Sequence, residues 1–300
     1  MAPPILHFDY ESSPYARKTK WILNAAGVDF KRVDQPRVLP RPDLEAMGIT
    51  YRRIPVLAVG KDVYCDSSLI ISIVLDLSGS KLKRGGASDK AWEAWGAETF
   101  QAVVTLVPGP ALSEVFVKDR KTVFPILNRK DFKELRPSGL ADLRSRLAFL
   151  ESEFLGNSSG PFSNGKEPSL ADLHVVWPIY WALKALGAGQ EPGLGKDDFP
   201  KVWAMIDALP EVKADTVSAD DAKKTILGSE FLSSKMEVEK NDPLASETGK
   251  KVTVESLDAE PGAHPQVGKL VGLTKRELVL ELDNGIRLHF PKEGYVVKAA

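Results

Sequence analysis

The sequence predicts a multidomain chain with an α/β part, an all-helical part and a small all-β part. Strand and helix signals alternate over the first eighty residues, and helical periodicity dominates the middle of the chain. The last fifty residues carry short runs of alternating hydrophobicity separated by turn residues. Because helices and strands have different hydrophobic periods, these changes of pattern indicate changes of fold class. We therefore expect domains over residues 1–82, 87–235 and 246–300.

The α/β part is predicted from the order of its elements and from the residues that bound them. Ser13 and Pro14 are typical of a helix start, and Gly27 is typical of a helix end. Prolines crowd residues 35–42 and predict a surface loop. The expected elements are a strand at 5–8, a helix at 14–26, a strand at 28–33, a hairpin at 54–65 and a helix at 66–77. This order predicts a mixed sheet with one parallel crossover and one antiparallel hairpin.

The helical part is expected to begin after a linker that contains Gly85 and Gly86. Ser169 and Asp172 have the spacing of a capping box, and the apolar run 173–186 follows them. We therefore interpret Ser169 and Asp172 as structural residues that begin a buried helix.

The all-β part is predicted from five short strands after a second polar linker. An Asp-Asn-Gly sequence at 283–285 is typical of a hairpin turn. The expected strands are 252–255, 267–273, 277–282, 286–290 and 295–297. Five short strands in so few residues predict a small antiparallel barrel.

Composition excludes several classes of function. The chain has 40 basic and 41 acidic residues, so its net charge of −1 provides no overall attraction for nucleic acid or an anionic membrane. A single cysteine, Cys65, excludes an intramolecular disulfide and fits a reducing compartment. The four histidines show no metal-ligand spacing, and the start of the chain lacks the pattern of a secretory signal. We expect a cytoplasmic protein without a metal, a membrane span or a nucleic-acid partner.

Three short motifs carry the functional information, whereas the common nucleotide-binding, hydrolase and metalloprotease motifs are absent from the sequence. They are Ser13-Pro14-Tyr15 after the first strand, Arg53-Ile54-Pro55-Val56-Leu57 before the hairpin, and Asp66-Ser67 before the last helix of the α/β part. Backbone N–H groups and a hydroxyl at a helix N-terminus can hold a carboxylate, and an adjacent aspartate can hold an ammonium group. The last motif can therefore bind both charges of an amino acid, although Asp and Ser are also common helix caps.

Together, these motifs and the helical part behind them resemble the glutathione S-transferase family over residues 4–232. The resemblance implies a thioredoxin-like N-terminal domain, a helical C-terminal domain and glutathione as co-substrate. It also implies a homodimeric enzyme that transfers the glutathione thiolate to a hydrophobic electrophile, in detoxification or secondary metabolism. Residues 246–300 lie outside this pattern and resemble an extension of some fungal members.

The resemblance also assigns roles to individual residues. Asp66 and Ser67 would bind the γ-glutamyl unit, and a cis Ile54–Pro55 step would present its backbone to the cysteinyl unit. Arg53 can approach the glycyl carboxylate, as can Arg41 from the proline-rich loop. The alternatives are solvated arginines and a trans proline at the start of a strand.

Thiol activation is assigned to Ser13, with Ser12 as the second candidate and Tyr15 as a neighbour. A hydroxyl that donates to the sulfur, at the positive end of a helix, favours the thiolate. Because this chain has no cysteine at position 13, we do not expect disulfide exchange. Two alternatives stay open: a non-catalytic or repurposed binding protein, and a glutathione-dependent isomerase or lyase.

Overall fold

The computed structural model describes residues 3–79 and 81–300, which form two compact units. The first, here called the sheet unit, contains the chain up to Thr19 together with Val28–Leu77 and Lys213–Ala300. The second, the helical unit, contains Lys20–Gly27 and Ser78–Val212. The C-terminal extension thus belongs to the same unit as the N-terminal α/β part. Of the predicted domain 1–82, residues 1, 2 and 80 lie outside the described residues.

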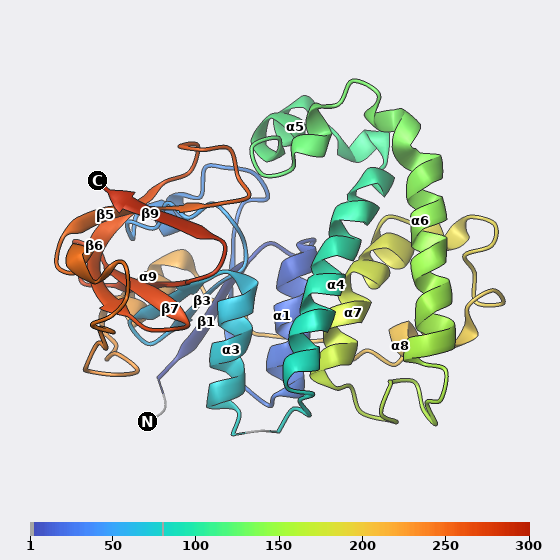
Figure 1. Ribbon diagram of the computed structural model, residues 1–300, viewed down its shortest axis with the longest axis horizontal. Helices are drawn as coiled ribbons and strands as arrows, with labels where there is room; N and C mark the ends of the chain where they lie inside the picture. The colour runs from blue at the N-terminus through green and yellow to red at the C-terminus, as the bar shows by residue number, and fades with distance from the viewer. Residues whose placement is uncertain (1–2, 80) are drawn as a thin grey trace. The chain divides into compact units, whose positions relative to one another are not determined.

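One sheet runs through the whole sheet unit (Figure 1). Its strands are β1 (Ile5–Asp9), β2 (Lys31–Asp34), β3 (Val56–Val59), β4 (Asp62–Cys65), β5 (Lys251–Ser256), β6 (Gln266–Leu273), β7 (Glu277–Glu281), β8 (Arg287–Pro291) and β9 (Tyr295–Ala299). Within the described residues, the spatial order is β2-β1-β3-β4-β8-β7-β6-β5-β9. The parallel pair β1·β2 and the antiparallel pairs β1·β3 and β3·β4 agree with the mixed sheet predicted for the α/β part.

The five strands of the extension lie close to their predicted positions, but they do not form a separate closed barrel. They continue the N-terminal sheet, because β8 pairs in parallel with β4 and places Val63 opposite Leu288. At the far end, β9 pairs with β5 and is an edge strand. The physical reason lies in β4, whose outer edge would otherwise leave backbone N–H and C=O groups without partners. All four β4 residues are buried in this arrangement.

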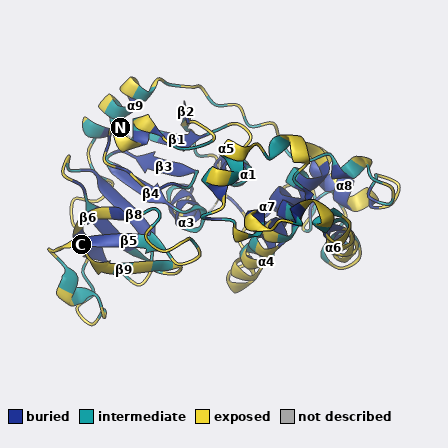
Figure 2. Ribbon diagram, turned by 90° about the horizontal axis from the view of Figure 1, so that it is seen from above, coloured by how far each residue is buried: buried dark blue, intermediate teal, exposed yellow. Residues whose placement is uncertain are grey.

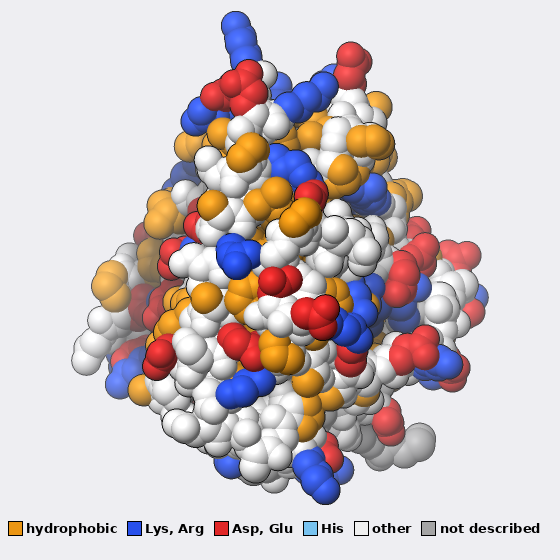
Figure 3. Space-filling view, turned by 90° about the vertical axis from the view of Figure 1, so that its right-hand side faces the viewer, with side chains coloured by type: hydrophobic (Ala, Val, Ile, Leu, Met, Phe, Trp, Pro, Cys, Tyr) orange, Lys and Arg blue, Asp and Glu red, His pale blue; other side chains and the backbone are white. Residues whose placement is uncertain are grey.

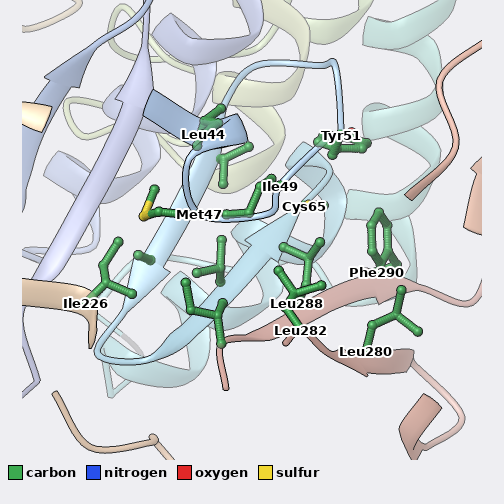
Figure 4. Close-up of a cluster of buried hydrophobic side chains, with 14 of the residues drawn as sticks. Leu44, Met47, Ile49, Tyr51, Cys65, Ile226, Leu280, Leu282, Leu288 and Phe290 are labelled. Carbon is green, nitrogen blue, oxygen red and sulfur yellow. The ribbon is translucent and has the colours of Figure 1, made fainter. Parts of the chain in front are cut away.

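The extension and the α/β part also share one hydrophobic core (Figure 4). Leu44 and Met47 belong to the segment around α2 (Pro42–Glu45), and Ile226 belongs to α9 (Ala219–Leu227). Leu288 and Phe290 of β8 enter the same cluster from the extension. Apolar burial is the main favourable contribution to folding, so this shared core ties the extension to the N-terminal part. In Figure 2 the central strands β3, β4 and β8 are correspondingly coloured as buried.

Among the other described α-helices, α1 (Pro14–Ala25) contributes to both units and α3 (Ser67–Leu77) belongs to the sheet unit. The helical unit contains α4 (Ala87–Val103), α5 (Glu114–Arg120), α6 (Arg136–Phe149), α7 (Leu170–Tyr180) and α8 (Pro200–Asp207). The helices α6 and α7 continue as π-helical turns over Leu150–Phe154 and Trp181–Ala185. None of the described helices is long and apolar enough to span a membrane. Figure 3 shows one face of the molecule, where hydrophobic and charged side chains are interspersed.

The predicted capping box is present at the start of α7. The Ser169 hydroxyl accepts a hydrogen bond from the Asp172 backbone N–H, and the Asp172 carboxylate accepts one from the Ser169 N–H at 2.9 Å. Asp172 also accepts bonds from the Ser169 hydroxyl at 2.6 Å and from the Ser163 N–H and hydroxyl at 2.8 and 3.1 Å. The Asp172 side chain therefore holds both the helix start and the preceding loop within the helical unit.

Candidate functional site

Strand register brings the three sequence motifs to one edge of the sheet. Phe8 of β1 lies opposite Val56 of β3, and Val56 lies opposite Cys65 of β4. The C-terminal ends of β1 and β4 and the N-terminal end of β3 therefore coincide. The segments that leave the sheet there are those that carry the Ser-Pro, Ile-Pro and Asp-Ser motifs. We call this edge the motif edge, and all of its residues belong to the sheet unit.

Asp66 occupies a specialised backbone position at the motif edge. Its φ of +72° lies in the left-handed region, and among the described residues it is the single non-glycine residue with positive φ. Its Oδ1 accepts a hydrogen bond from the Ser68 N–H at 2.8 Å, while Ser67 begins α3. The first N–H groups of a helix have no partner inside that helix. A strained residue beside such groups supports a hypothesis of function.

The Ile54–Pro55 peptide bond is cis, as the resemblance implies. Pro55 directly precedes β3 and is thus adjacent to the register pair formed by Val56 and Cys65. A second cis bond, Leu39–Pro40, lies in the proline-rich loop and was not predicted.

Ser13 directly precedes α1 and is 2% exposed. Its Oγ accepts a hydrogen bond from the Ala16 N–H at 3.2 Å, so it caps the helix. A hydroxyl that accepts one bond keeps its own hydrogen to donate, and capping and thiol activation are compatible roles. Ser12 is exposed, and Tyr15 is half-buried within the first turn of α1.

The two predicted arginines have different environments. Arg41 is 2% exposed; its Nε donates to the Pro36 carbonyl at 3.2 Å and its Nη1 donates to the Arg52 carbonyl. Arg41 therefore fixes the proline-rich loop to the segment before β3. Arg53 instead reaches the extension, where its Nη2 lies 2.6 Å from Asp258 Oδ1. Burial alone would raise the pKa of Asp258, but the Arg53 guanidinium outweighs that effect and holds the pKa below its ordinary value.

The extension contributes a second contact to the motif edge. The Tyr295 hydroxyl, at the start of β9, donates to Asp66 Oδ2 at 3.0 Å. The Tyr51 hydroxyl lies 3.1 Å from the Tyr295 hydroxyl and therefore donates to it, because the Tyr295 hydrogen is already directed at Asp66. Burial is the main cause that raises the pKa of both tyrosines well above the ordinary value. Both hydroxyls thus stay protonated and form a chain of donors that ends at Asp66.

Sequence reasoning missed Tyr51, Asp258 and Tyr295. Tyr295, the first residue of β9, pairs with Ser256, the last residue of β5. Because β8 runs parallel to β4, the C-terminal end of β8 lies at the motif edge. The β8–β9 turn and the segment after β5 therefore lie there as well. No local pattern around these residues indicates this placement. Tyr51 stands two positions before the Arg-Ile-Pro motif, which is the one local signal available.

Cys65, opposite Val56 in the sheet, is fully buried. Burial, followed by the neighbouring Asp66 carboxylate, raises the pKa of its thiol well above the ordinary value. A buried thiol that stays protonated is a poor nucleophile, so the Cys65 thiol is not suited to act as one.

Two family models match the chain. Residues 8–81 match the model of the glutathione S-transferase N-terminal domain, and residues 103–218 match that of a domain of unknown function (DUF7962). The first match includes every predicted glutathione-binding residue. A search of curated proteins finds no match to the sequence.

Solved structures with the same fold include one that is similar over its whole length. It is a GST-like protein from Pseudomonas syringae, with a TM-score of 0.70, 24% sequence identity and coverage of 100% of both chains, so the similarity extends to the C-terminal strands. A mutant of poplar glutathione transferase F1 has a TM-score of 0.50 at 16% identity and covers 76% of this chain and 100% of its own. The β-etherase LigF from a Sphingobium strain has a TM-score of 0.50 at 16% identity and covers 68% of this chain and 93% of its own.

Proposed function

Because residues 8–81 match the glutathione S-transferase N-terminal domain, we propose that the chain is a member of that family, binds glutathione at the motif edge and transfers the glutathione thiolate to a hydrophobic electrophile. The observation that carries this proposal is the strand register. It gathers the Ser-Pro, Ile-Pro and Asp-Ser motifs of one sequence at a single edge of one sheet.

The γ-glutamyl unit carries an ammonium and a carboxylate that the Asp-Ser motif can recognise separately. The Asp66 carboxylate balances the ammonium, and the N-terminus of α3 with the Ser67 hydroxyl binds the carboxylate. The donor chain from Tyr51 through Tyr295 holds the Asp66 carboxylate in place for this contact. The backbone of Ile54, two residues before β3, pairs with the cysteinyl unit, and Arg53 lies toward the glycyl end.

Ser13 activates the thiol in this proposal. A free thiol with a pKa near ~8.5 is mostly protonated at neutral pH. A hydrogen bond from the Ser13 hydroxyl and the positive end of α1 both favour the thiolate over the thiol. The sulfur then forms a bond to an electrophilic carbon of the second substrate, and the leaving group departs with the bonding electron pair.

Calorimetric titration with reduced glutathione and then with S-hexylglutathione tests the binding step. We expect saturable binding of both, with tighter binding of the conjugate because its chain buries additional apolar surface. Asp66→Ala removes a charged partner of the ammonium and should weaken both ligands by about tenfold or more, whereas Asp29→Ala, a change of an exposed aspartate before β2, should not. Absence of heat from either ligand at millimolar concentration, with an unchanged melting curve, would refute the proposal.

A second candidate is a repurposed binding protein of the same family. It is favoured by the ion pair between Arg53 and Asp258, because the extension thereby occupies a side chain that is predicted to contact glutathione. Turnover of chlorodinitrobenzene and of a panel of other electrophiles distinguishes the two, because a binding protein would bind the S-hexyl conjugate without catalysing any transfer.

We further propose that the chain acts as a homodimer in the cytoplasm, in detoxification or secondary metabolism. The resemblance of the first two domains to the family supports the dimer, and the single buried cysteine supports a reducing compartment. Light scattering of the purified protein would measure the mass of the particle against the 32.8 kDa of one chain.

A further inference from the structure

The arginine of the motif edge already has an anionic partner from its own chain. Arg53 Nη2 lies 2.6 Å from Asp258 Oδ1, and the same oxygen accepts a bond from the Ser256 hydroxyl at 2.5 Å. The Arg53 side chain is 28% exposed and that of Asp258 is 65% exposed. Asp258 is therefore the more exposed partner of the pair, and it already uses hydrogen-bonding capacity of Arg53 that a ligand would otherwise meet.

This ion pair changes the charge that a ligand would meet. An isolated guanidinium attracts a carboxylate, but the pair of Arg53 and Asp258 is neutral. A ligand carboxylate must either displace Asp258, and lose one ion pair to form another, or lie beside it and experience repulsion between like charges. In both cases the ligand gains little from its own negative charge.

A ligand whose end group is uncharged can contact Arg53 without being repelled by Asp258. An amide or ester at the same place keeps a carbonyl oxygen that accepts a hydrogen bond from Arg53, and an amide also offers an N–H donor to Asp258. Neither group is repelled by Asp258. The local charge pattern thus favours a neutral end group over an anionic one.

On the premise that the motif edge binds glutathione as proposed above, we propose that Asp258 is a specificity-determining residue. It selects γ-glutamyl thiol peptides whose C-terminal carboxyl is joined to an amine or an alcohol, in preference to peptides with a free terminal carboxylate. The extension thereby defines the class of thiol co-substrate through a residue that lies outside the α/β and helical parts.

The test compares reduced glutathione with its glycyl amide by calorimetric titration of the full chain. The wild-type protein should bind the amide at least as tightly as glutathione. Asp258→Asn should tighten glutathione by about fivefold, as expected for release of one surface ion pair, and change the affinity for the amide by less than about twofold. Glu260→Gln, which removes the same charge from an exposed position of the same loop, is the matched control and should leave the ratio of the two affinities unchanged.

The outcomes separate this inference from the proposed function. If the wild-type protein binds glutathione tenfold more tightly than the amide, and Asp258→Asn leaves that ratio unchanged, Asp258 does not determine specificity although glutathione binding stands. An equal shift in the Glu260→Gln control would attribute the effect to the net charge of the loop and would also overturn the assignment. If neither ligand binds, the proposed function itself fails and this inference fails with it.

Discussion

The donor chain from Tyr51 through Tyr295 to Asp66 predicts unequal effects of two changes that each remove one hydroxyl group. Tyr295→Phe removes the acceptor of Tyr51 and the donor to Asp66 together. Tyr51→Phe removes only the first donor, and Tyr295 keeps its bond to Asp66. We therefore expect Tyr295→Phe to destabilise the sheet unit more strongly than Tyr51→Phe.

The magnitudes follow from the burial of these groups. Tyr51 is 7% exposed, so leaving its hydroxyl without a hydrogen-bond partner lowers the free energy of unfolding by about 1–3 kcal/mol. Loss of a hydrogen bond to a carboxylate lowers it by about a further 1.5–3 kcal/mol. Because water partly replaces the bond to Asp66, we expect roughly 2–4 kcal/mol for Tyr295→Phe and about 1 kcal/mol for Tyr51→Phe. In the Tyr295→Phe background, Tyr51→Phe removes the stranded hydroxyl and should be neutral or stabilising.

The assay must report on the sheet unit. All six tryptophans lie in the helical unit, so their fluorescence does not follow these changes. Amide hydrogen exchange, measured by mass spectrometry on peptides from β5 and β9, gives the free energy of opening where Tyr295 acts. Each 1.4 kcal/mol corresponds to a tenfold change in protection. Equal effects of the two single changes, or additive effects in the double variant, would refute the donor chain.

Three further predictions concern the rest of the site and the fold. Ser13→Ala should lower turnover by roughly tenfold to a hundredfold with little change in glutathione affinity, while Ser12→Ala should leave both unchanged; equal turnover would remove Ser13 from the mechanism. Asp172→Ala strands the donors of the four hydrogen bonds that its carboxylate accepts, and should lower the stability of the helical unit by about 2–4 kcal/mol in urea denaturation followed by tryptophan fluorescence. Burial lowers the pKa of His289, but its bonds to Asp62 and Glu277, both 3.0 Å, outweigh burial and raise it. The contribution of this group to stability is therefore complete below about pH 6.5 and is lost as the pH rises through the folded-state pKa, by up to about 1.4 kcal/mol per pH unit; a His289→Asn variant should lack this slope.

Helix caps and turns were predictable from sequence because their signals are local. Ser13 before Pro14 and Ser169 before Asp172 are capping patterns whose hydrogen bonds close within three residues, and both form as expected. The strands of the extension were also located to within about two residues, because alternation and the turn at 283–285 are local features. The role of Arg41 as a ligand contact stays a prediction, and its burial against the carbonyls of Pro36 and Arg52 was not predicted, since it depends on how the loop folds back.

The sequence by itself determined which elements form and which motifs they carry, because caps, turns and hydrophobic periods act over a few residues. Only the tertiary structure decided that the extension joins the sheet. That outcome depends on the pairing of β4 with β8, whose partners Asp62 and Arg287 are more than two hundred positions apart. The same pairing places Asp258 and Tyr295 against Arg53 and Asp66, and no local pattern records such contacts. Backbone hydrogen bonds along a strand edge accept many sequences, so which edge is paired is settled by burial of the shared core rather than by any single motif.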